Sequence, residues 1–153
     1  MARTLYPSTN AAALIREFEG LRLKSYPDPG SGGAPWTVGY GHTGPEVRPG
    51  MTITKREAEE MLALDLKEAA QDVRRLTKES ETSQQQFDAL VSFQFNTGKL
   101  HGSTLLRKHR DGDRDATVRE FHRWIYASGR KLPGLIRRRA AEAALYASDR
   151  PGK

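Results

Sequence analysis

The first hydrophobic pattern along the chain predicts a short amphipathic helix. Residues 10–19 carry apolar side chains at helical spacing. Ser8 or Asn10 is suited to the N-cap position, and Gly20 is suited to the C-terminal end. The apolar face of this helix consists of Leu14, Ile15 and Phe18.

The pattern changes over residues 21–43, where glycine and proline become frequent. The stretch 27–35 contains three prolines and three glycines, and the stretch 36–40 is rich in aromatic and β-branched residues. Such a combination is typical of turns between short strands. We predict a small antiparallel hairpin or sheet here.

After Gly50 the pattern is helical to the end of the chain. Capping boxes at 54–57 and 83–86 each open a long helix. The further predicted helices are 103–109, 113–126 with an end near Gly129, and a last one that begins at Pro133. This order predicts an α+β, mostly α, fold. A small N-terminal β-containing lobe and a larger helical C-terminal lobe would enclose a cleft, a usual place for a ligand.

Composition limits the classes of protein. The 153 residues predict a single domain, 1–153. Cysteine is absent, which excludes disulfides, thiolate metal sites and a cysteine nucleophile. The histidines show no compact ligand spacing, so we expect no metal and no cofactor. The four histidines are His42, His101, His109 and His122.

The sequence also carries an expectation about localisation. It has no apolar run long enough for a membrane span, and residues 1–7 do not resemble a signal peptide. We therefore expect synthesis in the cytoplasm. If the substrate lies outside, another protein must release this one.

The positive charge is concentrated near the C-terminus. Residues 101–153 carry thirteen Lys and Arg against six Asp and Glu, within a net charge of +6 for the whole chain. The run Arg137–Arg139 is its densest part. It is either a solvated helix face or a surface for wall or membrane anions.

Three residues around the predicted β region are candidates for chemistry. Glu19 would end a helix, where the helix dipole and apolar neighbours favour a neutral carboxyl, the form a general acid needs. Glu17 is a weaker candidate because it points to nearly the opposite side. Asp28 lies in a proline-flanked turn, and Thr37 lies in a strand-like run. Taken singly, each of the three is also explained as an ordinary helix-end, turn or strand residue.

Together these motifs resemble the phage lysozymes of glycoside hydrolase family 24. The resemblance rests on Phe18-Glu19-Gly20, on Asp28 nine positions after Glu19, and on Thr37-Val38-Gly39-Tyr40-Gly41-His42. Further matching segments are 54–64, 93–98, 103–105, 132–135 and 137–142, so that the similarity covers about 10–147. One departure is the segment 30–35, which makes the gap between Asp28 and Thr37 longer than is usual in the family.

The resemblance implies a lysozyme-like fold and an endolysin that hydrolyses the β-1,4 bond between N-acetylmuramic acid and N-acetylglucosamine in peptidoglycan. Glu19 would protonate the leaving oxygen. Asp28 and Thr37 would position a water or stabilise the oxocarbenium-like state. By resemblance we expect a wide carboxyl separation and inversion of configuration. A holin would release the protein, which we expect to be monomeric.

The resemblance also suggests secondary residues. His42 would pair with Asp65 as a structural ion pair. The candidates for binding substrate are Thr43, Phe93, Gln94 and Ser103, with core packing an equal alternative for Phe93. Two rival functions remain at this stage. A nucleic-acid-binding module is favoured only by the basic C-terminal third, without a recognisable motif. A non-catalytic peptidoglycan-binding protein is disfavoured by the presence of Glu19.

Overall fold

The computed structural model describes residues 4–29 and 31–149, and the statements below concern these residues. Its elements in chain order are α1 (Thr9–Glu19), β1 (Arg22–Tyr26), β2 (Thr37–Gly39), β3 (His42–Thr43), α2 (Lys55–Thr77), α3 (Gln84–Thr97), α4 (Thr104–Arg110), α5 (Arg114–Phe121), β4 (Tyr126–Ala127), β5 (Arg130–Lys131) and α6 (Pro133–Ala147). The mostly helical α+β prediction is confirmed. No described helix combines the length and the apolar character needed to cross a membrane.

The β lobe is a three-stranded antiparallel sheet in the order β1-β2-β3. Tyr26 pairs with Thr37, and Thr37 pairs in turn with Thr43. Val38 on the central strand is fully buried in a small hydrophobic core with Ile15 of α1 and Leu62 of α2. The sheet is thereby fixed to the ends of both helices.

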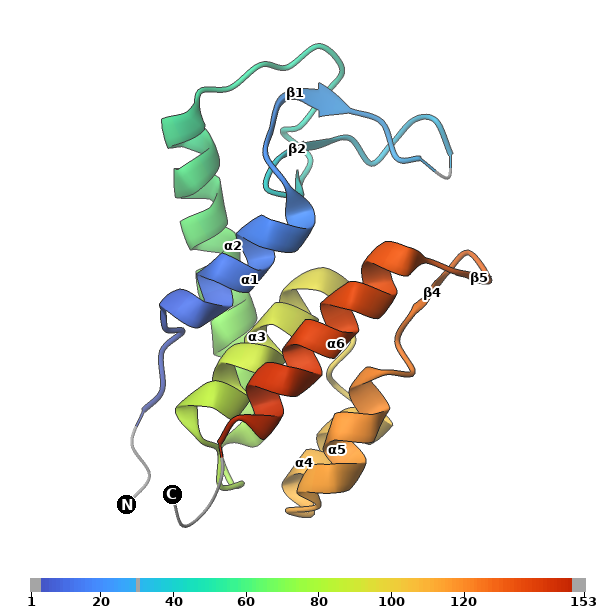
Figure 1. Ribbon diagram of the computed structural model, residues 1–153. Coiled ribbons are helices and arrows are strands. Elements are labelled where there is room, and N and C mark those ends of the chain that lie inside the picture. The colour runs from blue at the N-terminus through green and yellow to red at the C-terminus, as the bar shows by residue number, and fades with distance from the viewer. Residues whose placement is uncertain (1–3, 30, 150–153) are drawn as a thin grey trace.

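The helical lobe is built around α3. Seven consecutive residues of this helix, from Phe87 to Phe93, are buried, as expected of a helix surrounded on all sides. It packs against α1, α2 and α6, which Figure 1 shows grouped around it. Phe93 contacts Phe121 and Trp124 edge to face, with ring centroids 5.8 and 5.2 Å apart.

Helix α2 joins the two lobes. Its capping box at Thr54 and Glu57 is present as predicted. Ala58 and Leu62 lie in the core of the β lobe, whereas Val73 lies in the core of the helical lobe. The buried residues of this single helix therefore serve two separate cores.

The predicted helix over 113–126 is too long. Helix α5 ends at Phe121, and Tyr126–Ala127 forms a hairpin with Arg130–Lys131. The turn between these strands places Ser128 and Gly129 at φ 52° and 75°. Consecutive residues with positive φ are typical of a tight β-hairpin turn, so Gly129 closes a hairpin and does not end a helix.

Helix α1 is anchored at its start by Asp88, a fully buried carboxylate of α3. The Ser8 backbone N–H donates to Asp88 Oδ1 at 2.9 Å, and the Ser8 hydroxyl donates to Oδ2. Ser8, one of the two predicted N-caps, also accepts from the Asn10 N–H at 3.2 Å. This contact fixes the helix that ends at Glu19.

A buried histidine makes the helical lobe sensitive to acid. His109 is 3% exposed and contacts the Tyr146 hydroxyl through Nδ1 at 2.5 Å and the Thr82 hydroxyl through Nε2 at 2.8 Å. Burial, assisted by the charge of Arg110, lowers the pKa of His109 to about 4. The neutral ring is thus the native form.

We therefore expect acid to destabilise the fold through His109. The unfolded chain binds a proton below about pH 6.5, whereas the native state does so only near pH 4, so stability falls as the pH drops through this window. The loss should approach about 3 kcal/mol, measured by urea unfolding as a function of pH. His109→Gln should flatten this dependence between pH 6.5 and about 5. The same change at exposed His122 should not, and equal slopes for both variants would contradict the assignment.

Candidate active site

Glu19 is the last residue of α1 and lies where the two lobes meet. The helix ends there because Gly20 adopts φ 70° and its N–H returns to Arg16 O at 3.1 Å. The Glu19 side chain is 18% exposed. The carboxyl is thus held by the protein and still open to solvent on one side.

The contact that holds Glu19 comes from the far end of the chain. Arg138 Nη1 of α6 donates to Glu19 Oε2 at 2.6 Å, and the Arg138 side chain is only 4% exposed. The sequence predicted apolar surroundings for Glu19, but Leu21 is 36% exposed and does not enclose it. The main neighbour of the carboxyl is a buried guanidinium.

The other carboxyl oxygen faces Gly41 in the turn between β2 and β3. Gly41 has φ +74°, and a Cβ built on it would lie 2.3 Å from Glu19 Oε1. Only a glycine allows this backbone to approach the carboxyl so closely. The Gly-Tyr-Gly-His motif therefore places a bare stretch of backbone beside Glu19.

Thr37 is connected to Glu19 through Tyr26. The Tyr26 hydroxyl and the Thr37 side chain share a hydrogen bond, and the two residues pair across β1 and β2. Burial, together with the charge of Glu19, raises the pKa of Tyr26. The structure thus brings Glu19 and Thr37 to the same tyrosine.

Asp28 lies in a self-closed turn that takes up the additional residues of this chain. Its N–H donates to Gly33 O at 2.8 Å, and its carbonyl accepts from Gly32 N–H at 2.7 Å. The side-chain oxygen Oδ2 accepts from Ser31 N–H at 3.0 Å. The lengthened segment therefore folds back on itself beyond Asp28. The catalytic role of Asp28 stays a prediction.

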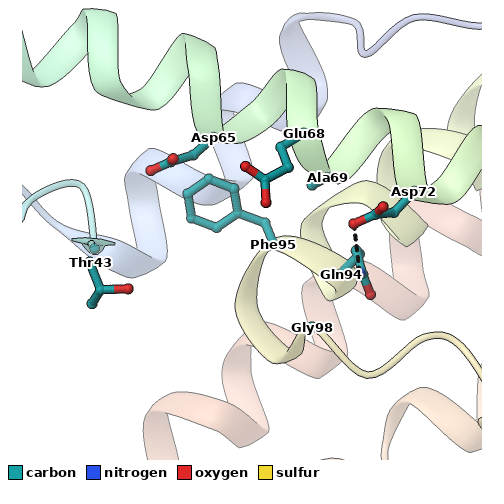
Figure 2. Close-up of a pocket in the computed structure, with 9 residues that line it drawn as sticks. Thr43, Asp65, Glu68, Ala69, Asp72, Gln94, Phe95 and Gly98 are labelled. Atoms are coloured by element: carbon teal, nitrogen blue, oxygen red, sulfur yellow. Dashed lines mark hydrogen bonds between the residues drawn. The ribbon is translucent and has the colours of Figure 1, made fainter. Parts of the chain in front are cut away.

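A hollow of about 430 Å³ lies between the β lobe and helices α2 and α3. Gly41 lines it from the β lobe, and α2 contributes a row of carboxylates. Figure 2 shows Asp65 and Glu68 beside the Phe95 ring, with Thr43 across the hollow. The lining residues are Gly41, Thr43, Asp65, Glu68, Ala69, Asp72, Gln94, Phe95 and Gly98. Gly41 borders both the hollow and Glu19, whereas Glu19, Asp28 and Thr37 are not themselves among the lining residues.

The four residues predicted to bind substrate divide into two pairs. Thr43 and Gln94 line the hollow, and Gln94 donates to Asp72 Oδ2 at 3.2 Å (Figure 2). Phe93 is fully buried, so the expectation that it lines the cleft is wrong and its packing alternative is right. Ser103 is the N-cap of α4, and its hydroxyl accepts from Leu106 N–H at 3.0 Å. This residue therefore has a structural role in starting the helix.

The predicted ion pair of His42 and Asp65 is present, and it has an additional member. His42 Nδ1 lies 2.6 Å from Asp65 Oδ2, while Nε2 lies 2.6 Å from Glu46 Oε2. Burial opposes the charged ring, but the hydrogen bonds that Glu46 and Asp65 accept from the ring outweigh it and raise the pKa of His42. The imidazole links β3 to α2 and to the loop after β3.

We expect Asp65→Asn to destabilise the fold by about 1–3 kcal/mol at mildly acidic pH, because it removes a charge-assisted hydrogen bond. The pair's contribution is complete below about pH 6.5 and is lost as the pH rises through the raised pKa of His42. Urea unfolding against pH measures this difference. The matched change Glu46→Gln, at an exposed partner, should have the smaller effect. A difference for Asp65→Asn that grows with pH would contradict this account.

The basic run Arg137–Arg139 is not a surface patch, contrary to both sequence interpretations, which placed the whole run on the surface. Arg137 is exposed, but Arg138 is 3% exposed and Arg139 is fully buried. Both are turned inward toward Glu142, which is also fully buried. Arg138 and Arg139 are therefore not available to wall or membrane anions, and of this run only Arg137 faces solvent.

Sequence reasoning missed Arg138 and Glu142 as parts of the site. One signal was available: Glu142 follows the two arginines at helical spacings of four and three residues, which brings such side chains together. The contact with Glu19 had no such local signal. Within 4–29 and 31–149, no group of metal-ligating side chains large enough to hold an ion occurs.

The fold and this arrangement define a lysozyme-like protein, and comparisons identify the family. The profile of the phage lysozyme family matches residues 16–142, so the chain belongs to that family. The endolysin of Salmonella phage P22 is 38% identical over 147 residues, covering 92% of this chain and 97% of that one. The endolysin of Bacillus phage PZA is 41% identical over 90% of this chain, which spans only 54% of that protein.

Solved structures agree with this membership. An endolysin from Escherichia coli O157:H7 phage FAHEc1 matches with a TM-score of 0.82 at 30% identity over the whole of both chains. The muramidase domain of SpmX from Asticaccaulis excentricus matches with a TM-score of 0.82 at 34% identity, over 93% of this chain and 97% of that domain. The lysozyme-like fold predicted from the sequence is therefore confirmed.

Proposed function

We propose that this protein is a muramidase, an endolysin that hydrolyses the β-1,4 bond between N-acetylmuramic acid and N-acetylglucosamine in bacterial peptidoglycan. The observation that carries the proposal is the position of Glu19. Its carboxyl lies at the junction of the lobes, with a guanidinium on one oxygen and, beside the other, the backbone of Gly41, which in turn borders the hollow. Membership of the phage lysozyme family supports the same reaction.

The geometry suggests which oxygen of Glu19 delivers the proton. Oε2 accepts a hydrogen bond from Arg138 and is thereby engaged. Oε1 lies on the side of Gly41, which borders the hollow. Glu19 would carry its proton on Oε1 and pass it to the glycosidic oxygen as the bond breaks.

Asp28 and Thr37 would act on the other face of the sugar. Thr37, held by Tyr26, would orient a water, and Asp28 would accept its proton or stabilise the oxocarbenium-like state. We expect the two carboxyls to stand far enough apart for that water, about 6.5–9.5 Å, and the configuration to invert. Cleavage of the wall would lyse the host, with release by a holin as a further prediction.

Analysis of the digestion products tests this function. Purified peptidoglycan would be digested, the new reducing ends reduced with borohydride, and the fragments identified by mass spectrometry. A muramidase leaves reduced muramic acid, whereas a glucosaminidase leaves reduced glucosamine, which would overturn the assignment. Wall binding without any new reducing ends would favour a non-catalytic binding protein. NMR of the first product anomer tests inversion, and retention would contradict it.

A further inference from the structure

Behind Arg138 lies a buried cluster of charges that the proposed reaction does not use. Arg138, Arg139 and Glu142 lie on one face of α6, and each is 3% exposed or less. Arg138 Nε lies 3.3 Å from Glu142 Oε2, and Arg139 Nε lies 2.9 Å from Glu142 Oε1. Arg138 therefore stands between two carboxylates, Glu19 in front and Glu142 behind.

Neutral groups of α3 complete the cluster. The Ser92 hydroxyl donates to Glu142 Oε2 at 2.6 Å, and Arg139 Nη2 donates to Asn96 Oδ1 at 2.6 Å. Arg139 also lies over the Phe93 ring, 5.1 Å from its centroid. These contacts fix both guanidinium groups and leave Arg138 Nη1 directed at Glu19.

Stability alone is a weak explanation for this cluster. Removing an arginine–glutamate–arginine triad from water costs free energy, and apolar replacements of such triads are often as stable or more stable. Here, some of the buried charged atoms lack a well-directed hydrogen bond, namely Arg139 Nε, Arg139 Nη1 and Glu142 Oε1. A cluster with this cost, placed directly behind the candidate general acid, has a better explanation in function.

We infer that Glu142 is a positioning residue for Glu19: it holds the Arg138 guanidinium from behind and balances the charge that Glu19 experiences. The inference rests on the proposed role of Glu19 as general acid. Burial raises the pKa of Glu142, while Arg139, Arg138 and the Ser92 hydroxyl act in the opposite direction by stabilising its carboxylate. When Glu142 is ionised, the three buried residues present a net charge of +1 to Glu19. Without it, the two guanidinium groups would present +2 and hold Glu19 in its ionised form, which cannot donate a proton.

The charges of the cluster do reach Glu19. Arg139 makes no direct contact with Glu19 in the described contacts, yet the pKa of Arg139, which burial lowers, is raised in part by attraction to Glu142 and to Glu19. A further titratable group that faces Glu19 is Tyr26, from β1. Helix α3 contributes the neutral Ser92 and Asn96, and His42 beyond Gly41 is already paired with two carboxylates.

A set of three variants separates charge balance from a merely structural role. Glu142→Gln raises the charge of the cluster, Arg139→Gln lowers it, and the double variant restores +1. The alkaline limb of the kcat profile on peptidoglycan should move by about one pH unit to lower pH in Glu142→Gln and to higher pH in Arg139→Gln. It should return to the wild-type position in the double variant. Exposed Arg137→Gln, on the same helix, should leave the limb unchanged.

Rates are normalised to the folded fraction, which circular dichroism follows at each pH. Single variants whose limbs stay in place, or move in the same direction, would overturn the inference. If Glu142→Gln does not fold, Arg139→Gln and the double variant still decide. Only a charge effect moves the alkaline limb to higher pH in Arg139→Gln and returns it to the wild-type position in the double variant. Glu19→Gln is measured alongside: retained activity would refute the proposed function, while lost activity with unmoved limbs would refute only the role of Glu142.

Discussion

Glu19→Gln should lower kcat on peptidoglycan by at least about 10²–10⁴-fold while the protein remains folded. The amide has nearly the same shape as the carboxyl and can still accept from Arg138, but it cannot deliver a proton to the leaving oxygen. Release of reducing ends from purified wall, with protein concentration corrected for the folded fraction, measures the effect.

The matched control is Glu17→Gln, two residues earlier on the same helix. Glu17 is exposed and lies on a different side of α1, so its activity should remain within about twofold of wild type, as for a surface substitution. Sedimentation with insoluble wall should show that Glu19→Gln still binds. Undiminished activity in Glu19→Gln would remove the site assignment, whatever the stability of the variant.

The predictions that rest on local chemistry agree well with the structure. The capping boxes at Thr54 and Ser83 open α2 and α3, and Gly98 ends α3 in the left-handed conformation. These signals act within a few residues, where side chain and backbone meet regardless of the rest of the fold. The helices could therefore be located before any tertiary contact was known.

The failures arise where the deciding contact is distant in sequence or depends on a turn. The segment 113–126 has helical spacing, but the turn at Ser128 and Gly129 favours a hairpin that begins at Tyr126. The position of Phe93 along its helix fits either a residue that lines the cleft or one that packs in the core. Only its contacts with Phe121 and Trp124 decide for the core.

The candidate site was predictable only in part, because some of its contacts are local in sequence and others are distant. Glu19 lies just before the strand that carries Tyr26, and Tyr26 pairs with Thr37 and experiences the charge of Glu19. Arg138 lies 119 residues after Glu19, so no local pattern connects the two. Its charge was interpreted as part of a surface run because runs of basic residues are mostly solvated, and of the three arginines only Arg137 does face solvent.

Arg138→Met should cost both stability and activity. It removes the partner of Glu19 and one of the two guanidinium groups around buried Glu142, so the free energy of unfolding should fall by about 3 kcal/mol. With its carboxyl no longer fixed, Glu19 should also lose about 10- to 100-fold in kcat per folded molecule. Chemical unfolding and reducing-end release measure the two losses separately.

The neighbouring residue provides the control that distinguishes a buried pair from a basic surface. Arg137→Met removes the same charge from the same run, but its side chain is exposed, so stability should change by less than about 0.5 kcal/mol. Arg138→Lys should rescue only part of the activity, because an ammonium cannot present the separate donors that Nη1 and Nε direct at Glu19 and Glu142. Equal losses at 137 and 138 would mean that the charge of the run matters and its burial does not.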